Sequence, residues 1–318
     1  MAGGAKRIPF SKLGTYWHLY LLVLPSLLLL ALFAYYPAAS AFYHAFFRWN
    51  GDFVNEFVGV DNFLEAFRDP VLYWGFAVVF ILIAANLFTM VPSIITAVVI
   101  HRLRSARAAY VYKVLFVVPM IIPWMVGLLI WKFFYDPSVG ILNKVLNATG
   151  LMTVLQWLDG LLGWRVFVAG ANPVWLGDAK LVIPALIFWG FPWVGVVGVL
   201  LYLAGLQSID ESVYEAADID GIGWFKKFLY IELPLILTQV RLNLVLMIIG
   251  TLQGYGLMYV LFGTSGGPKG VATVPGLYMF REAFETGRAG YACCIGLILF
   301  VFILILTEIN NRYVRVEK

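Results

Sequence analysis

Charged side chains gather in one short stretch of this chain, between Tyr214 and Pro234, where they alternate with alanine, glycine and aromatic residues. The charged residues of this stretch are Glu215, Asp218, Asp220, Lys226, Lys227 and Glu232. The sequence contains no HExxH motif, no cysteine–histidine metal pattern and no nucleophile elbow around a serine. The absence of these motifs gives little support to the interpretation that the chain is a membrane enzyme.

A second group of polar residues is set inside long apolar runs, where hydrogen-bonding side chains are scarce. The candidates are Asn86, Trp189, Trp193, Asn243, Gln253, Tyr255 and Tyr259. Glycines near Tyr255 are expected to loosen the helix there, as in the broken helices that build transport sites. Such side chains bind polyhydroxylated solutes, but they also bond one membrane helix to another. For the polar stripe from Asn86 to Thr96, interhelical bonding is the favoured interpretation, and the tryptophans have packing as their alternative.

The composition defines the environment of these groups. Of 318 residues, 62% are hydrophobic and 13% are charged, with a mean hydropathy of +0.88, whereas soluble domains have about 25% charged residues. The chain is therefore predicted to be an all-α, polytopic membrane helical bundle. Its net charge of +4 is too small and too dispersed to indicate binding to nucleic acid. Cys293 and Cys294 are adjacent in an apolar run and are interpreted as packing residues.

Six apolar runs are each long enough for a helix to cross about 30 Å of hydrocarbon. The predicted spans, within a single transmembrane domain covering 1–318, are 16–47, 71–100, 112–134, 181–206, 234–262 and 289–310. The first run is too long for a signal peptide, although Ala39-Ser40-Ala41 resembles a cleavage site, so an uncleaved span is predicted. An external segment is expected at 135–180, with 156–172 as an insertion. Because the central, apolar windows of these runs contain no Asp, Glu, Lys or Arg, coupling to protons or sodium is disfavoured.

The distribution of lysine and arginine orients the predicted spans. The short loop near 101–113 carries Arg102, Arg104, Arg107 and Lys113 and no acidic residue. Basic residues also occur at the N-terminus, where they are Lys6, Arg7 and Lys12, and in the C-terminal tail. This bias predicts that both termini and the charged stretch at 209–233 of a multi-pass membrane protein face the cytoplasm.

Local signals predict two short helices within the charged stretch. Ser208, followed three residues later by Glu211, matches a capping box, so the first helix is expected over 209–219. Gly221 falls where a left-handed turn ends a helix, and a second helix is expected to start near Trp224. On periodicity alone, an amphipathic helix lying on the membrane surface is an equally good interpretation.

The order of residues in this stretch resembles the EAA loop of type I ABC importer permeases. Glu215-Ala216-Ala217-Asp218-Ile219-Asp220-Gly221 is followed by Ile231-Glu232-Leu233-Pro234, with Pro234 expected in the first turn of the fifth span. Residues 57–63 and 263–268 are similar to segments of the binding-protein-dependent carbohydrate permeases, especially the maltose- and glycerol-phosphate-type subunits. The resemblance extends over almost the whole chain.

The resemblance implies that the EAA helix docks, as a coupling helix, on a separate cytoplasmic ATPase. It puts Glu215, Ala216, Ala217, Asp220 and Gly221 at that contact, where the two alanines are expected to form a small, flat patch. The chain itself would be a transport subunit and not an enzyme, without a cofactor of its own. It has no G-x-x-x-x-G-K-[ST] loop, so ATP and magnesium would belong to the partner ATPase.

The resemblance also implies a multi-pass protein in the lipid of the bacterial cytoplasmic (inner) membrane. Its partners would be a second, similar but heterologous permease, two ATPase subunits and an extracytoplasmic substrate-binding protein. In relatives, the fifth span around Gln253 and Tyr255 faces the translocation cavity. The loop at 263–269 is expected to face the binding protein, or else to be a plain turn. The expected solute is a sugar or oligosaccharide. The alternatives are a phosphodiester or polyol carried by the same architecture, and a stand-alone channel or facilitator.

Overall fold

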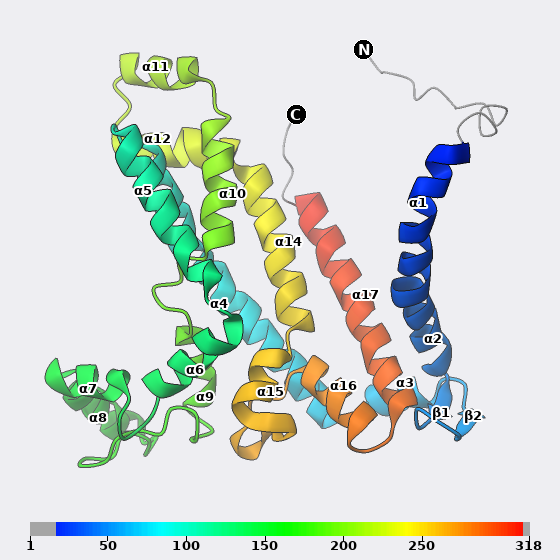
Figure 1. Ribbon diagram of the computed structural model, residues 1–318. Helices are drawn as coiled ribbons and strands as arrows, with labels where there is room; N and C mark the ends of the chain where they lie inside the picture. The colour runs from blue at the N-terminus through cyan, green and yellow to red at the C-terminus, as the bar shows by residue number, and fades with distance from the viewer. Residues whose placement is uncertain (1–16, 314–318) are drawn as a thin grey trace. The chain divides into compact units, whose positions relative to one another are not determined.

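The computed structural model describes residues 17–313, whose regular secondary structure is almost entirely helical (Figure 1). The strands β1 and β2 have three residues each, so the all-α class predicted from the composition is confirmed. The N-terminal Lys6, Arg7 and Lys12 and the end of the C-terminal tail, on which the predicted orientation partly rests, lie outside the described residues. The chain, predicted as one domain, divides by its contacts into two compact units.

Helices long and apolar enough to cross a membrane are found at Tyr20–His44, Pro70–His101 and Ala289–Arg312. Three further pairs of helices meet the same criterion together, but their members are bent by 89°, 75° and 68° relative to each other. By length and composition, residues 17–313 therefore hold three spans, or up to six if each bent pair is one span.

The first unit comprises residues 17–67 and 282–297. Its elements are α1 (Trp17–Leu30), η2 (Ala31–Tyr35), α2 (Tyr36–His44), β1 (Phe47–Trp49), β2 (Asn55–Phe57), α3 (Asp61–Ala66) and the first part of α17 (Ala289–Tyr313). The helical segments α1, η2 and α2 follow one another without interruption. The apolar window of this helix has no buried residue, which suits a span whose side chains face lipid.

The hairpin of β1 and β2 is not predicted from the sequence. The first helix ends at His44, and β1 then pairs with β2 in antiparallel register, with Phe47 opposite Phe57. Asn62 of α3 is buried, and its Nδ2 donates to the carbonyl oxygens of Ala45 (2.8 Å) and Phe47 (2.9 Å). These bonds fix the hairpin to the helix end, because buried carbonyl groups require partners.

The second unit contains the described residues 68–281 and 298–313. Its elements are α4 (Pro70–His101), α5 (Ala106–Val117), η3 (Val118–Ile121), α6 (Trp124–Phe134), α7 (Ile141–Ala148), α8 (Leu151–Leu162), α9 (Val182–Phe188), α10 (Val196–Gln207), α11 (Glu211–Ile219), α12 (Trp224–Lys227), η4 (Phe228–Glu232), α13 (Leu233–Leu235), α14 (Leu237–Gln253), α15 (Gly256–Phe262), η5 (Gly263–Ser265), η6 (Pro268–Gly270), most of α16 (Pro275–Phe284) and the rest of α17. Helices α10 and α14 both pack against α4 (Figure 1). Val98, Tyr202, Leu206 and Ile236 lie fully buried in the core there.

The third and the fourth predicted span each consist of two helices rather than one. The span expected over 112–134 is formed by α5 with η3 and then by α6, across the 89° bend. Pro119 and Pro123 lie at this bend, where proline removes a helical hydrogen bond. The span expected over 181–206 is formed by α9 and α10, which are joined by an irregular segment at 189–195.

The fifth span also differs from the prediction. Elements α12, η4 and α13 form a helix, Trp224–Leu235, which we call the surface helix, and α14 begins only at Leu237 after a 68° bend. Pro234 therefore lies in the surface helix and not in the first turn of the span. The span is interrupted at Gly254, whose φ and ψ of −73° and 101° are not helical. This break lies among the glycines that the sequence indicates as a loose point.

The predicted external segment at 135–180 contains two helices of its own, α7 and α8, which contact each other. Its small core is built from the buried residues Met152, Phe167 and Leu181. The buried carboxylate of Asp159 accepts hydrogen bonds from the backbone N–H groups of Val166 and Phe167. The insertion at 156–172 is thus folded onto a local core.

Candidate functional site

The charged stretch folds into α11 and the surface helix, which Figure 1 shows at the same end of the second unit as the start of α14. The N-cap of α11 is Asp210, whose side chain accepts a hydrogen bond from the Ser212 N–H (2.9 Å). The capping box predicted on Ser208 is therefore wrong. Ser208 ends α10, and its hydroxyl donates to the Gly205 carbonyl (2.7 Å). Asp210 suits the cap because its negative charge also favours the helix dipole.

The residues predicted to meet the ATPase do not all lie on the surface. Glu215, Ala216 and Asp220 are exposed, whereas Ala217 is only 3% exposed. The predicted patch of two alanines is therefore wrong, since only the Ala216 methyl is available to a partner. The reason is the helical period of 3.6 residues, which turns neighbouring side chains by about 100°.

Gly221 reverses the chain after α11. Its φ of +67° lies in the left-handed region, which a residue with a Cβ adopts at a cost of about 1–2 kcal/mol. The turn lets the Ile222 N–H donate to the Ala217 carbonyl (3.0 Å), which closes the end of the helix. The left-handed turn predicted at this glycine is confirmed.

Polar contacts hold α11 to the rest of the second unit. The Tyr214 hydroxyl lies 3.1 Å from Nε2 of His101, at the end of α4. Asp218 pairs with Lys227, whose ammonium nitrogen is 5.9 Å from the centre of the Tyr214 ring. These residues line a cavity of about 400 Å³ between α11, the surface helix and the end of α4. The position of α11 therefore depends on side chains from two other elements.

An ion pair between Arg102 and Glu232 is the feature of this region that sequence reasoning missed. Glu232 is fully buried, and its two carboxylate oxygens accept hydrogen bonds from Nε (2.9 Å) and Nη2 (2.6 Å) of Arg102. The same guanidinium donates to the Trp224 carbonyl (3.2 Å) and lies 4.8 Å from the centre of the Trp224 ring. The sequence offers no signal for the pair, because the two residues are 130 positions apart.

Four of the predicted solute-pathway residues line one cavity of about 540 Å³ in the second unit. They are Asn86 of α4, Trp189 and Trp193 of the irregular segment, and Asn243 of α14. The lining contains no charged side chain. Within residues 17–313, no group of three or more His, Cys, Asp or Glu side chains is placed to hold a metal ion. The cavity therefore offers neutral hydrogen-bonding groups and indole rings.

One buried hydroxyl holds the irregular segment in place beside this cavity. The Ser93 Oγ donates to the Trp193 carbonyl (3.2 Å) and accepts a hydrogen bond from the Gly195 N–H (2.9 Å). Trp193 has a φ of +59°, which is unusual for a residue with a Cβ. Ser93 thus satisfies two backbone groups that no regular helix pairs.

The two amides of the cavity bond helix to helix. Nδ2 of Asn243 donates to the Tyr202 hydroxyl (2.7 Å), and Nδ2 of Asn86 donates to Oγ1 of Thr251 (3.1 Å). These bonds join α14 to α10 and α4 to α14. Asn86 therefore lines the cavity and also bonds α4 to α14, so the predicted role in the solute pathway and the predicted interhelical bond do not exclude each other.

The remaining predicted pathway residues lie elsewhere, at the break between α14 and α15. Gln253 is exposed, while the rings of Tyr255 and Tyr259 lie 5.5 Å and 5.1 Å from that of Phe280. None of the three lines the cavity of about 540 Å³. The structure thus separates the predicted pathway residues into two groups.

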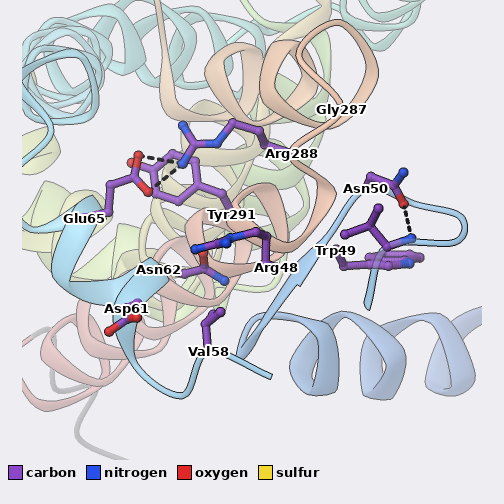
Figure 2. Close-up of a pocket in the computed structure, with 11 residues that line it drawn as sticks. Arg48, Trp49, Asn50, Val58, Asp61, Asn62, Glu65, Gly287, Arg288 and Tyr291 are labelled. Carbon is purple, nitrogen blue, oxygen red and sulfur yellow. Dashed lines mark hydrogen bonds and ion pairs between the residues drawn. The ribbon is translucent and has the colours of Figure 1, made fainter. Parts of the chain in front are cut away.

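Figure 2 shows another polar pocket, of about 330 Å³, within the first unit. Arg288 points to Glu65, with Nη2 2.5 Å from both carboxylate oxygens, and also pairs with Glu282 (3.4 Å). Burial lowers the pKa of Arg288, but the two carboxylates outweigh it and raise that pKa. Asn50 accepts hydrogen bonds from two N–H groups of its own hairpin turn. Arg288 thus ties α3 to the start of α17 and Asn50 stabilises the hairpin turn, so these polar groups of the pocket are interpreted as structural.

Comparison with known proteins places this geometry in a wider group. Residues 92–315 match the family described as "Binding-protein-dependent transport system inner membrane component". The match covers more than half of the chain and includes α11, the surface helix and most of the cavity lining.

Individual relatives extend the similarity over nearly the full length. The chain is 28% identical over 303 residues to the sulfoquinovosyl glycerol transport system permease protein SmoG of Agrobacterium fabrum, covering 93% of this chain and 90% of that protein. It is 28% identical over 304 residues to the sn-glycerol-3-phosphate transport system permease protein UgpA of Yersinia pestis, covering 94% of each. The fold matches, with a TM-score of 0.76 and 21% identity, a chain from the crystal structure of a bacterial alginate ABC transporter in complex with an alginate pentasaccharide-bound periplasmic protein, covering 96% of this chain and 97% of that one.

Proposed function

Because this chain belongs to the family of binding-protein-dependent transport system inner membrane components, we propose that it forms the passage for a sugar or oligosaccharide in an ATP-driven importer. It is a multi-pass inner-membrane transport subunit. The observation that supports the proposal most directly lies within the second unit. There the exposed helix α11, which carries the EAA sequence, is connected through the surface helix to helices that line a neutral polar cavity.

The docking of α11 on an ATPase is supported by its shape and exposure. Glu215, Ala216 and Asp220 present two carboxylates around a small side chain, which permits close approach of a groove with basic residues. The turn at Gly221 and the cap at Asp210 give the helix two defined ends. A short helix with fixed ends transmits a movement of the ATPase better than a loop does, because fewer of its backbone torsions can change in response.

A neutral solute is supported by the chemistry of the cavity. Amides, hydroxyl groups and indole faces recognise sugars, whereas an anion in a site without charged groups loses its hydration without compensation. This favours a neutral sugar or oligosaccharide. A polyol is also neutral and fits the same lining, and the similarity to a relative named for sn-glycerol-3-phosphate transport keeps a phosphate ester as an alternative.

The assembly that we propose contains a second, heterologous permease, two ATPase subunits that carry ATP and magnesium, and an extracytoplasmic binding protein. The fold match to a transporter crystallised with its periplasmic protein supports the last of these partners. The basic loop at 101–113 supports a cytoplasmic position for α11 and for both termini.

Uptake by cells lacking this chain tests the proposal. The labelled probes are maltose, trehalose, diacetylchitobiose, glycerol and glycerol 3-phosphate, and the deletion strain carries either an empty vector or the wild-type chain. We expect uptake of a saccharide to be lost in the deletion and restored by the chain. Loss confined to glycerol or glycerol 3-phosphate would instead indicate a polyol or its phosphate ester as the solute.

A second measurement separates the importer from a facilitator. Liposomes that contain this chain alone, without nucleotide, are tested for flux of the probe identified in cells. We expect no flux above that of empty liposomes, because the proposed importer requires an ATPase. Downhill flux through the isolated chain would contradict the proposal.

A further inference from the structure

The contacts between the coupling region and the transport helices are unequal in strength. The bond between Tyr214 and His101 joins one hydroxyl to one ring nitrogen. Arg102 and Glu232, by contrast, meet through two parallel hydrogen bonds, at 2.9 Å and 2.6 Å, with the carboxylate fully buried. Charge-assisted bidentate bonds are roughly twice as strong as neutral ones and define orientation as well as distance.

Arg102 is also held by Trp224, in addition to its two hydrogen bonds to Glu232. Its guanidinium donates to the Trp224 carbonyl and lies against the Trp224 ring, so the first and the third turn of the surface helix are both fixed to it. Lysine would not reproduce this arrangement, because it lacks the planar fork of donors. The end of α4 and the surface helix therefore meet in one defined orientation.

The positions of the two partners along the chain give this contact its mechanical importance. Arg102 directly follows α4, the helix that contributes Asn86 and Ser93 to the cavity. Glu232 precedes Ile236, the fully buried residue at the bend before α14, which contributes Asn243. The pair thus joins the end of α4 to the surface helix, next to the contact between His101 and Tyr214 of α11.

We propose that Arg102 and Glu232 form the joint that passes a displacement of α11 to α4 and α14 as a single movement. The joint rests on the proposed docking of α11 to an ATPase. Both members are positioning residues: they touch neither the solute nor nucleotide, and they act by keeping the surface helix and the end of α4 together during transport.

The decisive variant is the double substitution Arg102→Gln with Glu232→Gln. A single substitution leaves a buried charge unpaired and disturbs folding, whereas replacing both partners with neutral amides removes the ion pair and leaves no buried charge unpaired. The control is Arg104→Gln, which removes an exposed arginine from the same loop. Co-purification of the ATPase subunits shows that each variant assembles.

The joint is measured by the distance between spin labels in the reconstituted complex. Labels are attached at Tyr230→Cys on the surface helix and Phe88→Cys on α4, which are 70% and 78% exposed, in a chain whose two native cysteines are replaced by serine. With the pair intact, we expect one narrow distance distribution that is the same without nucleotide and with a non-hydrolysable ATP analogue. In the double variant, we expect the distribution to broaden or shift when the analogue binds.

Uptake provides the second readout. In the deletion strain, the double variant is expected to restore uptake of the identified saccharide at a rate about tenfold below that of wild type, within the range of typical coupling free energies. Arg104→Gln is expected to behave as wild type in both measurements. An unchanged label distance together with wild-type uptake in the double variant would overturn the joint.

The test separates the joint from the function on which it rests. Maleimide modification of Ile219→Cys, on the exposed side of α11, is measured with and without the ATPase subunits. Protection by the ATPase supports docking, and an insensitive double variant then rejects only the joint. Absence of protection in the wild-type complex rejects the docking itself.

Discussion

At the scale of single residues, the two glycines that follow α11 have different requirements. Gly221 has a φ of +67°, whereas Gly223 has an extended backbone with a φ of −68°. A Cβ added to either would meet no atom within 4 Å. The two positions therefore differ in backbone conformation and not in available space, which makes them a matched pair.

We predict that Gly221→Ala impairs the importer while Gly223→Ala does not. Alanine at position 221 must pay the left-handed penalty of about 1 kcal/mol or change the turn, which shifts α11 relative to the surface helix. The measurement is saccharide uptake in the deletion strain, with the amount of chain in the membrane as a check. Gly221→Asn should retain more activity, because asparagine tolerates the left-handed region. Equal uptake by the two alanine variants would show that the turn is not needed.

At the scale of elements, the irregular segment at 189–195 depends on a bond from a different helix. Ser93 is 4% exposed and serves the backbone of Trp193 and Gly195 at once. Irregular backbone at membrane depth is tolerated only where other groups satisfy it. This single hydroxyl therefore explains how the fourth span can be broken beside a cavity.

We predict that Ser93→Ala lowers the stability of the purified chain by about 1–3 kcal/mol, the usual cost of leaving buried polar groups without a partner. The measurement is the apparent unfolding temperature in detergent, together with uptake in cells. Thr89→Val is the control, because the Thr89 hydroxyl donates to a carbonyl of its own helix (Asn86, 3.1 Å). A larger effect of Thr89→Val than of Ser93→Ala would contradict the assigned bond.

The first unit has its own close contact, at the start of α17. A Cβ at Gly290 would lie 2.0 Å from the Phe47 carbonyl oxygen and 2.9 Å from the Trp49 nitrogen. Because both are backbone atoms, the hairpin cannot yield by rotating a side chain. The absence of a side chain at Gly290 is what lets β1 approach the helix.

We predict that Gly290→Ala detaches the hairpin from α17. Limited trypsin digestion should then cut faster after Arg48, whose side chain is 71% exposed. Gly160→Ala is the matched control, since that helical glycine has no atom within 4 Å of an added Cβ. Cleavage at Arg48 that is no faster than in this control would show that the contact at Gly290 is not as close as described.

At the scale of the whole molecule, the orientation in the membrane is a prediction from the distribution of lysine and arginine. We predict that an impermeant maleimide labels Phe53→Cys in intact spheroplasts but labels Ile219→Cys only after the membrane is opened. The reason is that the basic residues of the loop at 101–113 favour a cytoplasmic position for that face of the protein, on which α11 is expected to lie. Both positions are well exposed in the chain, at 91% and 86%. The native Cys293 and Cys294 are replaced by serine. Labelling of Ile219→Cys from outside would reverse the orientation and remove α11 from the ATPase.

Properties that depend on composition or on neighbouring residues were predictable from the sequence. The apolar content indicated a helical membrane protein, because each backbone group in lipid needs a partner within its own segment. The order of residues around Gly221 indicated a left-handed turn, because the steric limits of that turn act on one residue. The sequence prediction placed the N-cap of α11 at Ser208, whereas the structure has it at Asp210. Serine and aspartate can both cap a helix, and only the position at which α10 ends decides between them.

Contacts between distant residues were decided by the tertiary structure. The sequence by itself determined the chemical types present, the membrane class and the existence of α11. Only packing decided that Arg102 meets Glu232, and that Asn86 and Asn243 share a cavity while Gln253 does not. The physical reason is that such contacts depend on how α4, α10 and α14 pack. The free energy of that packing is distributed over many apolar side chains, so no local sequence pattern predicts it.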